Sequence, residues 1–111
     1  MAEMLVLICE EDDDARAALV EAARAAGHTT MAMADIREAE EAITTFAVGA
    51  VIADLLVISL ASLLRPTAMR VLITSVPNML TQAELAQFGV RKVLLKPLGQ
   101  LGPLVLEPND A

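Results

Sequence analysis

The sequence predicts a doubly wound α/β fold, in which helices cover both faces of a parallel β-sheet. Short, uninterrupted apolar runs alternate along the 111 residues with longer segments of helical periodicity. Strands of a parallel sheet are buried on both faces, so they are expected to appear as such unbroken runs. Polar residues directly follow most of the runs, at the positions where loops of this fold carry ligand-binding groups.

Five segments have the composition of buried strands. They are rich in Val, Ile, Leu and Met and are bounded by glycine, proline or charged residues. The run "TTMAM" is the weakest of the five because threonine and alanine replace larger apolar residues. In chain order, the expected strands are residues 5–9, 29–33, 50–53, 70–74 and 92–95.

The first two helices are predicted from their end signals. We expect Asp13 or Asp14 to cap the first helix, because acids favour the positive end of a helix, and Gly27 to end it. For the second helix, Asp35 followed by Glu38 resembles a capping box, and the closing glycine comes after residue 47.

The third and fourth helices are expected to be short. Residues 55–69 have to supply a loop, a crossover helix and a return, and Pro66 stops any helix there, which leaves about two turns. Thr81 and Glu84 form a capping signal for the fourth helix, and Gly89 ends it.

The C-terminal residues predict a reduced or absent last helix. Two glycines and two prolines interrupt "LGQLGPLVLEPNDA", so we expect a single domain over residues 1–111 with a core at about 4–98 and an irregular tail at 99–111. Without a covering helix, the apolar residues of the tail are expected to form a surface for a homodimer or for docking of another partner. These residues are Leu98, Leu101, Leu104, Val105 and Leu106.

Composition argues against several functions. The net charge is −7 and the eight basic residues are scattered, which argues against nucleic-acid binding. No apolar stretch is long enough to span a membrane, and the N-terminus lacks a basic signal-peptide region. The single cysteine, Cys9, fits a reducing cytoplasm and is expected to be buried and inert, while His28 is expected to be a partly exposed turn residue.

Polar residues at the strand ends form one candidate site. Glu10 and Glu11 end the first strand, Asp54 the third, Thr74 the fourth and Lys96 the fifth. Because the carboxyl ends of parallel strands meet at one edge of the sheet, we expect these side chains to converge. Three carboxylates at that edge would suit a hard divalent cation such as Mg²⁺.

This ordered pattern resembles the response-regulator receiver domain, the CheY-like fold of two-component signalling, over residues 4 to about 98. The residues that carry the resemblance are Glu10, Glu11, Arg16, Asp54, Thr74, Lys96 and Pro97. The resemblance implies a flavodoxin-like sheet of strand order 2-1-3-4-5.

The resemblance also implies a function. Asp54 would accept a phosphoryl group from a sensor histidine kinase or a phosphotransfer protein, with Glu10, Glu11 and Asp54 as Mg²⁺ ligands. Thr74 and Lys96 would bind the phosphoryl group, and signalling would pass through protein contacts. Such a chain would not be an enzyme beyond self-phosphorylation and autodephosphorylation.

Three departures leave an alternative open. Receivers usually carry Asp where this chain has Glu11 and an aromatic switch residue where it has Val93, and the crossover that follows Asp54 is short here. The alternative is a receiver-like fold that acts as a phosphorylation-independent interaction or dimerisation module. A flavodoxin-like cofactor site is excluded because the five acids at residues 10–14 would repel a phosphate. The cognate kinase, the downstream target and the pathway do not follow from the sequence.

Overall fold

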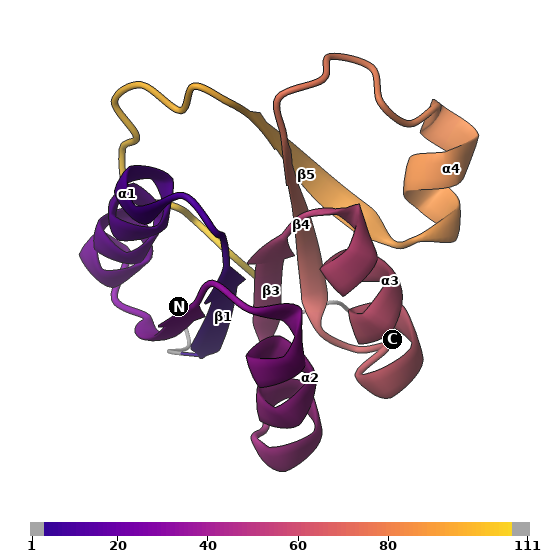
Figure 1. The fold of residues 1–111 in the computed structure, drawn as a ribbon, viewed down its shortest axis with the longest axis horizontal. Helices are drawn as coiled ribbons and strands as arrows, with labels where there is room; N and C mark the ends of the chain where they lie inside the picture. The colour runs from indigo at the N-terminus through magenta and orange to yellow at the C-terminus, as the bar shows by residue number, and fades with distance from the viewer. Residues whose placement is uncertain (1–3, 108–111) are drawn as a thin grey trace.

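Five parallel strands form one sheet in the order β2-β1-β3-β4-β5 (Figure 1). The structure is a computed structural model that describes residues 4–107. The strands, which confirm the predicted fold, are β1 (Leu5–Cys9), β2 (Thr29–Met33), β3 (Ala50–Ala53), β4 (Met69–Thr74) and β5 (Val90–Leu95). The predictions for residues 1–3 and 108–111, including the end of the tail, lie outside the described residues.

Four helices connect the strands and cover the sheet. They are α1 (Asp13–Ala25), α2 (Ile36–Thr45), α3 (Leu55–Leu64) and α4 (Gln82–Gln87). Figure 1 shows α2 and α3 side by side, and α1 set apart from them. Each of the first two helices therefore returns the chain to a parallel strand, as a doubly wound sheet requires.

Side chains that alternate along the strands divide the core between the two faces. On one face, Leu7 and Val51 pack with residues of α2 and α3, including Ile43 and Ile58. On the other face, Ile8 and Ile52 pack with Leu19 of α1 and with the C-terminal residues. Successive residues of β1 and β3 thus belong to different clusters, because neighbouring side chains in a strand point to opposite faces.

The helix ends confirm most of the predicted signals and correct two of them. Asp35 caps α2, and Thr81 with Glu84 forms a complete capping box at α4. The cap of α1 is Asp12 rather than Asp13 or Asp14, because the helix begins one or two residues earlier than expected. Helix α2 ends at Thr45, two residues earlier than the predicted limit at residue 47.

Helix α3 is longer than the two turns expected for it. It contains 10 residues because Asp54, directly after β3, serves as its N-cap, so no loop separates strand and helix. At the other end, Ser62 Oγ donates to the Phe88 carbonyl oxygen at 3.2 Å, and Arg70 Nε donates to the same oxygen at 2.8 Å. The last turn of α3 is therefore tied to the turn between α4 and β5.

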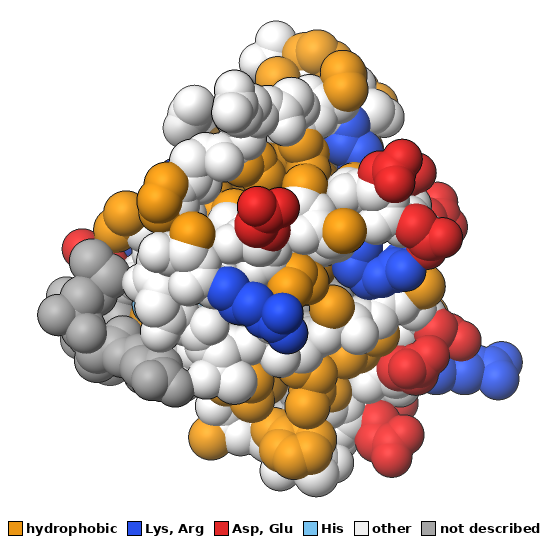
Figure 2. All heavy atoms as spheres, turned by 90° about the vertical axis from the view of Figure 1, so that its left-hand side faces the viewer, with side chains coloured by type: hydrophobic (Ala, Val, Ile, Leu, Met, Phe, Trp, Pro, Cys, Tyr) orange, Lys and Arg blue, Asp and Glu red, His pale blue; other side chains and the backbone are white. Residues whose placement is uncertain are grey.

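The C-terminal segment, residues 96–107, contains no helix or strand but covers part of the sheet. The expectation that its leucines lack cover is wrong, because Leu104 and Leu106 are buried in the same cluster as Ile8 and Ile52. The Leu104 N–H donates to the Ala22 carbonyl of α1 at 3.0 Å, which fixes the segment against that helix. Figure 2 shows hydrophobic side chains between charged residues on the side that faces left in Figure 1.

His28 is buried rather than partly exposed, which corrects the sequence-based expectation. Gly27 has a φ of 91°, in the region that glycine adopts most easily, and the His28 N–H donates to the Ala23 carbonyl. This turn directs the imidazole inward, where neither ring nitrogen has a hydrogen-bond partner among the described residues.

None of the helices in residues 4–107 is long and apolar enough to cross a membrane.

Candidate functional site

Four strand ends bring the predicted site residues to one edge of the sheet. Because all five strands are parallel, their carboxyl ends share an edge. Glu10 and Glu11 follow β1, Asp54 follows β3, Thr74 is the last residue of β4 and Lys96 follows β5. The topology thus confirms the shared edge, and the side-chain contacts decide which of these residues meet.

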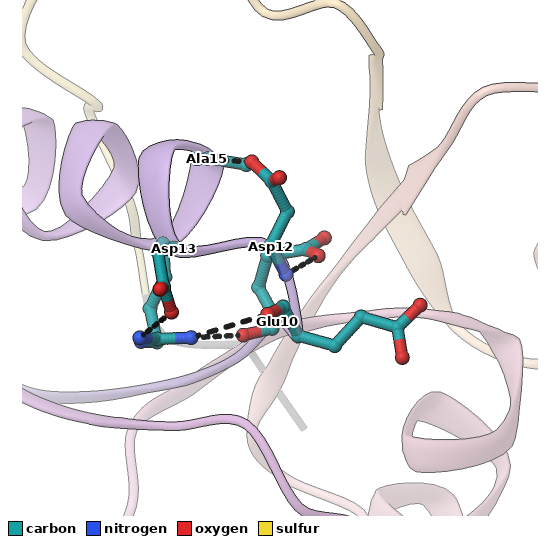
Figure 3. Close-up of polar contacts among 6 residues, drawn as sticks. Glu10, Asp12, Asp13 and Ala15 are labelled. Atoms are coloured by element: carbon teal, nitrogen blue, oxygen red, sulfur yellow. Dashed lines mark hydrogen bonds and ion pairs between the residues drawn. The ribbon is translucent and has the colours of Figure 1, made fainter.

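Glu10 is buried and both of its carboxylate oxygens have partners. Oε1 forms an ion pair with Lys96 Nζ at 2.6 Å. Oε2 accepts the backbone N–H of Asp12 at 2.8 Å, as Figure 3 shows. A buried carboxylate needs such partners, because an isolated charge away from water is strongly unfavourable. Since β3 and β4 lie between β1 and β5, the lysine side chain reaches across the ends of two strands.

The acids that follow Glu10 have separate structural roles. The Asp12 side chain accepts the Ala15 N–H at 2.8 Å and caps α1, and Asp13 forms an ion pair with Arg16 (Figure 3). Arg16 also donates to the Glu10 carbonyl oxygen at 2.9 Å, which holds the loop against the helix. Glu11 and Asp14 are exposed. Hydrogen bonds and water therefore relieve most of the repulsion in this run.

Asp54 opens onto the same cavity as Glu10, Glu11 and Lys96. The cavity has a volume of about 220 Å³. The Asp54 side chain is exposed, and its Oδ1 accepts the Val57 N–H at 3.2 Å as the cap of α3. Four of the five predicted site residues thus line one cavity, with three carboxylates facing one ammonium group.

Thr74 is not part of that cavity. Its backbone carbonyl accepts the Lys96 N–H at 2.9 Å, so the two residues are neighbours along the edge. Its buried hydroxyl group accepts the Val76 N–H at 3.1 Å, donates to Met79 Sδ at 3.7 Å, and lines a second cavity together with Val93. No feature of the sequence indicates Met79 as the partner of this hydroxyl.

Cys9 lies on the wall of the acidic cavity and is buried, as predicted. Burial raises the pKa of its thiol to about 11, and the nearby carboxylates of Asp54 and Glu10 add to this effect. A thiol with this pKa stays protonated at neutral pH, which makes it a poor nucleophile.

The carboxylates around the cavity have the chemistry of an Mg²⁺ site, although residues 4–107 contain no three His, Cys, Asp or Glu side chains grouped to hold a metal ion. Glu11 and Asp54 are exposed, and the helix cap uses only Oδ1 of Asp54. Glu10 is different, because the Lys96 ammonium and the Asp12 N–H occupy its two oxygens. Glu11 and Asp54 therefore have carboxylate oxygens available to a cation, whereas Glu10 would first have to release a partner.

Comparison with solved structures shows that the chain has the receiver fold. The Vibrio cholerae chemotaxis protein CheY4 has a TM-score of 0.73 at 18% identity, and the match covers 86% of this chain and 88% of that one. The receiver domain of the Pseudomonas aeruginosa sensor histidine kinase PA1611 has a TM-score of 0.68 at 16% identity, covers 86% and 87%, and has a magnesium ion coordinated in its active-site cleft.

A longer protein shares the fold as well. NtrX from Brucella abortus matches with a TM-score of 0.73 at 22% identity over 86% of this chain, which spans only 23% of the NtrX chain. No protein-family model matches the sequence, and no curated protein matches it. The likeness therefore lies in the fold.

Proposed function

We propose that this chain is a single receiver domain that accepts a phosphoryl group on Asp54 and signals through protein contacts. The observation that carries the proposal is that Asp54, at the carboxyl end of β3, faces the same cavity as Glu10, Glu11 and Lys96. An exposed carboxylate beside a cation and two further acids is suited to phosphoryl transfer, which depends on position and charge neutralisation.

The proposed step is a displacement at phosphorus. An Asp54 carboxylate oxygen attacks the phosphorus atom of a phosphohistidine on a sensor histidine kinase or phosphotransfer protein. The phosphorus–nitrogen bond breaks, the imidazole nitrogen keeps the electron pair and takes up a proton, and Asp54 becomes an acyl phosphate. To end the signal, water attacks the same phosphorus atom, the bond between phosphorus and the Asp54 oxygen breaks, inorganic phosphate leaves and the carboxylate is restored.

The other cavity residues have supporting roles in this proposal. The Lys96 ammonium, which reaches the cavity from β5, neutralises charge on the phosphoryl oxygens. Glu10, Glu11 and Asp54 would hold Mg²⁺, which when bound supplies further charge neutralisation. Thr74 would donate its hydroxyl group to a phosphoryl oxygen after a local rearrangement, since Met79 is its partner in this structure. A cytoplasmic location remains a prediction from the single cysteine.

Intact-mass measurement tests the proposal. The protein is incubated with Mg²⁺ and acetyl phosphate, and we expect one phosphoryl adduct in the wild type and none in Asp54→Asn. Asparagine retains the helix-capping ability, so this variant removes the nucleophile and preserves the fold. Asp35→Asn is the matched control, because Asp35 caps α2 as Asp54 caps α3 and, unlike its neighbours Ala34 and Ile36, does not itself line the cavity. An adduct that persists in Asp54→Asn would contradict the assignment.

The second candidate function is a phosphorylation-independent interaction or dimerisation module. The observation that favours it is the outer face of α3, where Leu56 is 70% and Leu63 is 82% exposed in a helix without charged residues. An apolar helix is normally buried, so these leucines indicate a contact surface. On the C-terminal segment, where the sequence predicted the homodimer, Val105 remains as an exposed large apolar residue.

Sedimentation velocity over a range of protein concentrations tests the module. A dimer that Leu63→Gln dissociates and Val105→Gln leaves intact would assign the contact to α3. The opposite result would assign it to the C-terminal segment. A wild type that stays monomeric at every concentration and forms no adduct with acetyl phosphate would contradict homodimerisation and phosphorylation together.

A further inference from the structure

The second cavity at the site edge has a lining quite different from the acidic one. It lies between β4, β5 and the segment that leads into α4, and it has a volume of about 290 Å³. Its walls include Leu72, Leu85, Val93 and Leu95, and none of its lining residues carries a charge. Helix α4, which is described in full, has no buried residue, so it packs only loosely above this cavity.

The size of the cavity limits what it can hold. Ligand pockets usually have volumes of about 300–1,000 Å³, so this one is at the lower limit. An apolar cavity of about 150 Å³ is enough to bind benzene. The space therefore fits one substituted ring, and it is too small for a nucleotide. The uncharged lining favours a neutral ligand, because a charged group would lose its hydration without gaining a partner.

Two side chains favour an aromatic ring that carries a hydroxyl group. Thr74 is 7% exposed, and its hydroxyl donates only to the Met79 thioether, at 3.7 Å, which is a weak acceptor. An oxygen acceptor on the ligand would therefore form a better hydrogen bond. The Met79 sulfur, once released, would form a favourable contact with the edge of an aromatic ring.

We propose that this cavity binds a neutral phenol ring. The chain contains no tyrosine, so a phenol has to come from another molecule, either as a small compound or as the tyrosine side chain of a protein. The ring fills the space between Leu72, Leu85 and Val93, and its hydroxyl oxygen accepts from Thr74. Phosphorylation at Asp54, which lines the other cavity, is a separate proposal, although both proposals use the hydroxyl group of Thr74.

Methyl NMR of the whole chain tests the proposal with p-fluorophenol and fluorobenzene, which differ only in the hydroxyl group. We expect saturable shifts at Leu72, Met79, Leu85 and Val93 with p-fluorophenol. Val93→Phe fills the cavity from within and should weaken binding more than about tenfold. Val105→Phe is the matched control, because the same substitution outside the cavity should leave binding unchanged.

The hydroxyl contact has its own variant. Thr74→Val should weaken p-fluorophenol binding about three- to tenfold and leave fluorobenzene binding unchanged. If Val93→Phe does not fold, Leu85→Phe serves as a second variant, because it fills the same cavity from the opposite wall. Blocked tyrosine amide distinguishes the sources: binding of both probes supports a protein side chain, and binding of p-fluorophenol alone supports a small molecule.

Three results would overturn the proposal: no shifts in the wild type, equal binding by Val93→Phe and wild type, or shifts confined to α1 and the C-terminal segment. The samples contain neither a phosphodonor nor a metal ion. A negative result therefore leaves the proposed phosphorylation of Asp54 unaffected, and an absent phosphoryl adduct leaves the phenol cavity unaffected.

Discussion

Different kinds of structure cover the two halves of the sheet. In the half that contains β1 and β3, helices of 10 to 13 residues pack on both faces, and every residue of β3 is buried. In the half that contains β4 and β5, α4 has only six residues, and the extended C-terminal segment lies on the opposite face. Of the two edge strands, β5 has four of its six residues exposed, whereas β2 has two of its five exposed.

We call the half with β1 and β3 the packed half and the half with β4 and β5 the open half. Every residue of β4 is buried, so the open space of the second half lies around β5 and the segments that cover it. Cavities of about 480 and 360 Å³ lie between α1 and residues 96–103, and the Thr74 cavity lies beneath the segment before α4. An extended segment buries alternate side chains only, so it fills less space than a helix does. Glu10 and Asp54 extend from the packed half, whereas Thr74 and Lys96 extend from the open half.

The largest expected effect concerns the C-terminal segment as part of the core. Leu106 is fully buried although it belongs to no helix or strand, so Leu106→Ala should lower the free energy of unfolding by about 2–5 kcal/mol. Val105→Ala, at the exposed neighbouring position, should cost less than about 0.5 kcal/mol. Urea denaturation measures both. Equal effects would mean that the segment does not pack as described.

The next largest effect on stability is expected at Gly89, a glycine in the open half. Gly89 has a φ of 67°, and a Cβ there would contact the Arg70 guanidinium group. Gly89→Ala should therefore lower the free energy of unfolding by about 1–3 kcal/mol. At Gly102, a Cβ would meet no atom within 4 Å, so Gly102→Ala is the matched control and should be close to neutral. Thermal unfolding measures both variants. Equal midpoints would mean that the backbone at Gly89 does not have the conformation described.

The ion pair between Glu10 and Lys96 connects the two halves. A double-mutant cycle with Glu10→Gln and Lys96→Met should give a coupling energy of about 0.5–3 kcal/mol, because the carboxylate is buried and the contact is 2.6 Å. The same cycle with Asp13→Asn and Arg16→Met, at a pair whose acid is exposed, should give less than about 1 kcal/mol. A coupling energy near zero for the buried pair would mean that this ion pair does not stabilise the contact between the two halves.

The smallest effect tests burial of Cys9 in the packed half. Its folded pKa of about 11 lies above that of an unfolded thiol, so the protonated form contributes stability that is complete below pH 8 and is lost between about pH 9 and 11. We expect a loss of about 1 kcal/mol by pH 10 relative to Cys9→Ala. The measurement is the free energy of unfolding as a function of pH for the wild type and Cys9→Ala. Parallel curves would contradict the burial of the Cys9 thiol.

The strands were predictable because burial on both faces imposes an apolar composition. The predicted starts of β4 and β5 differ from the structure by one and two residues, and the capping residues Asp35, Thr81 and Glu84 are where their sequence patterns predicted. The shared edge of the site residues was also predictable, since it follows from parallel strands alone.

Side-chain direction and irregular packing were not predictable in the same way. Thr74 lines a different cavity because a residue at a strand end points to one face or the other according to register, which the sequence leaves open. An aspartate after a strand can be a loop residue or a helix cap, so the length of α3 depended on the role of Asp54. The burial of Leu104 and Leu106 has no periodic signal, because the segment is extended and irregular.

Helix α3 is anchored at both ends, and this has a mechanical consequence. Its first turn is hydrogen-bonded to the Asp54 carboxylate, and Ser62 near its other end shares the Phe88 carbonyl with Arg70. A helix of 10 residues behaves as a stiff rod of about 15 Å. A displacement of Asp54 is therefore transmitted through the stiff helix to the turn that precedes β5.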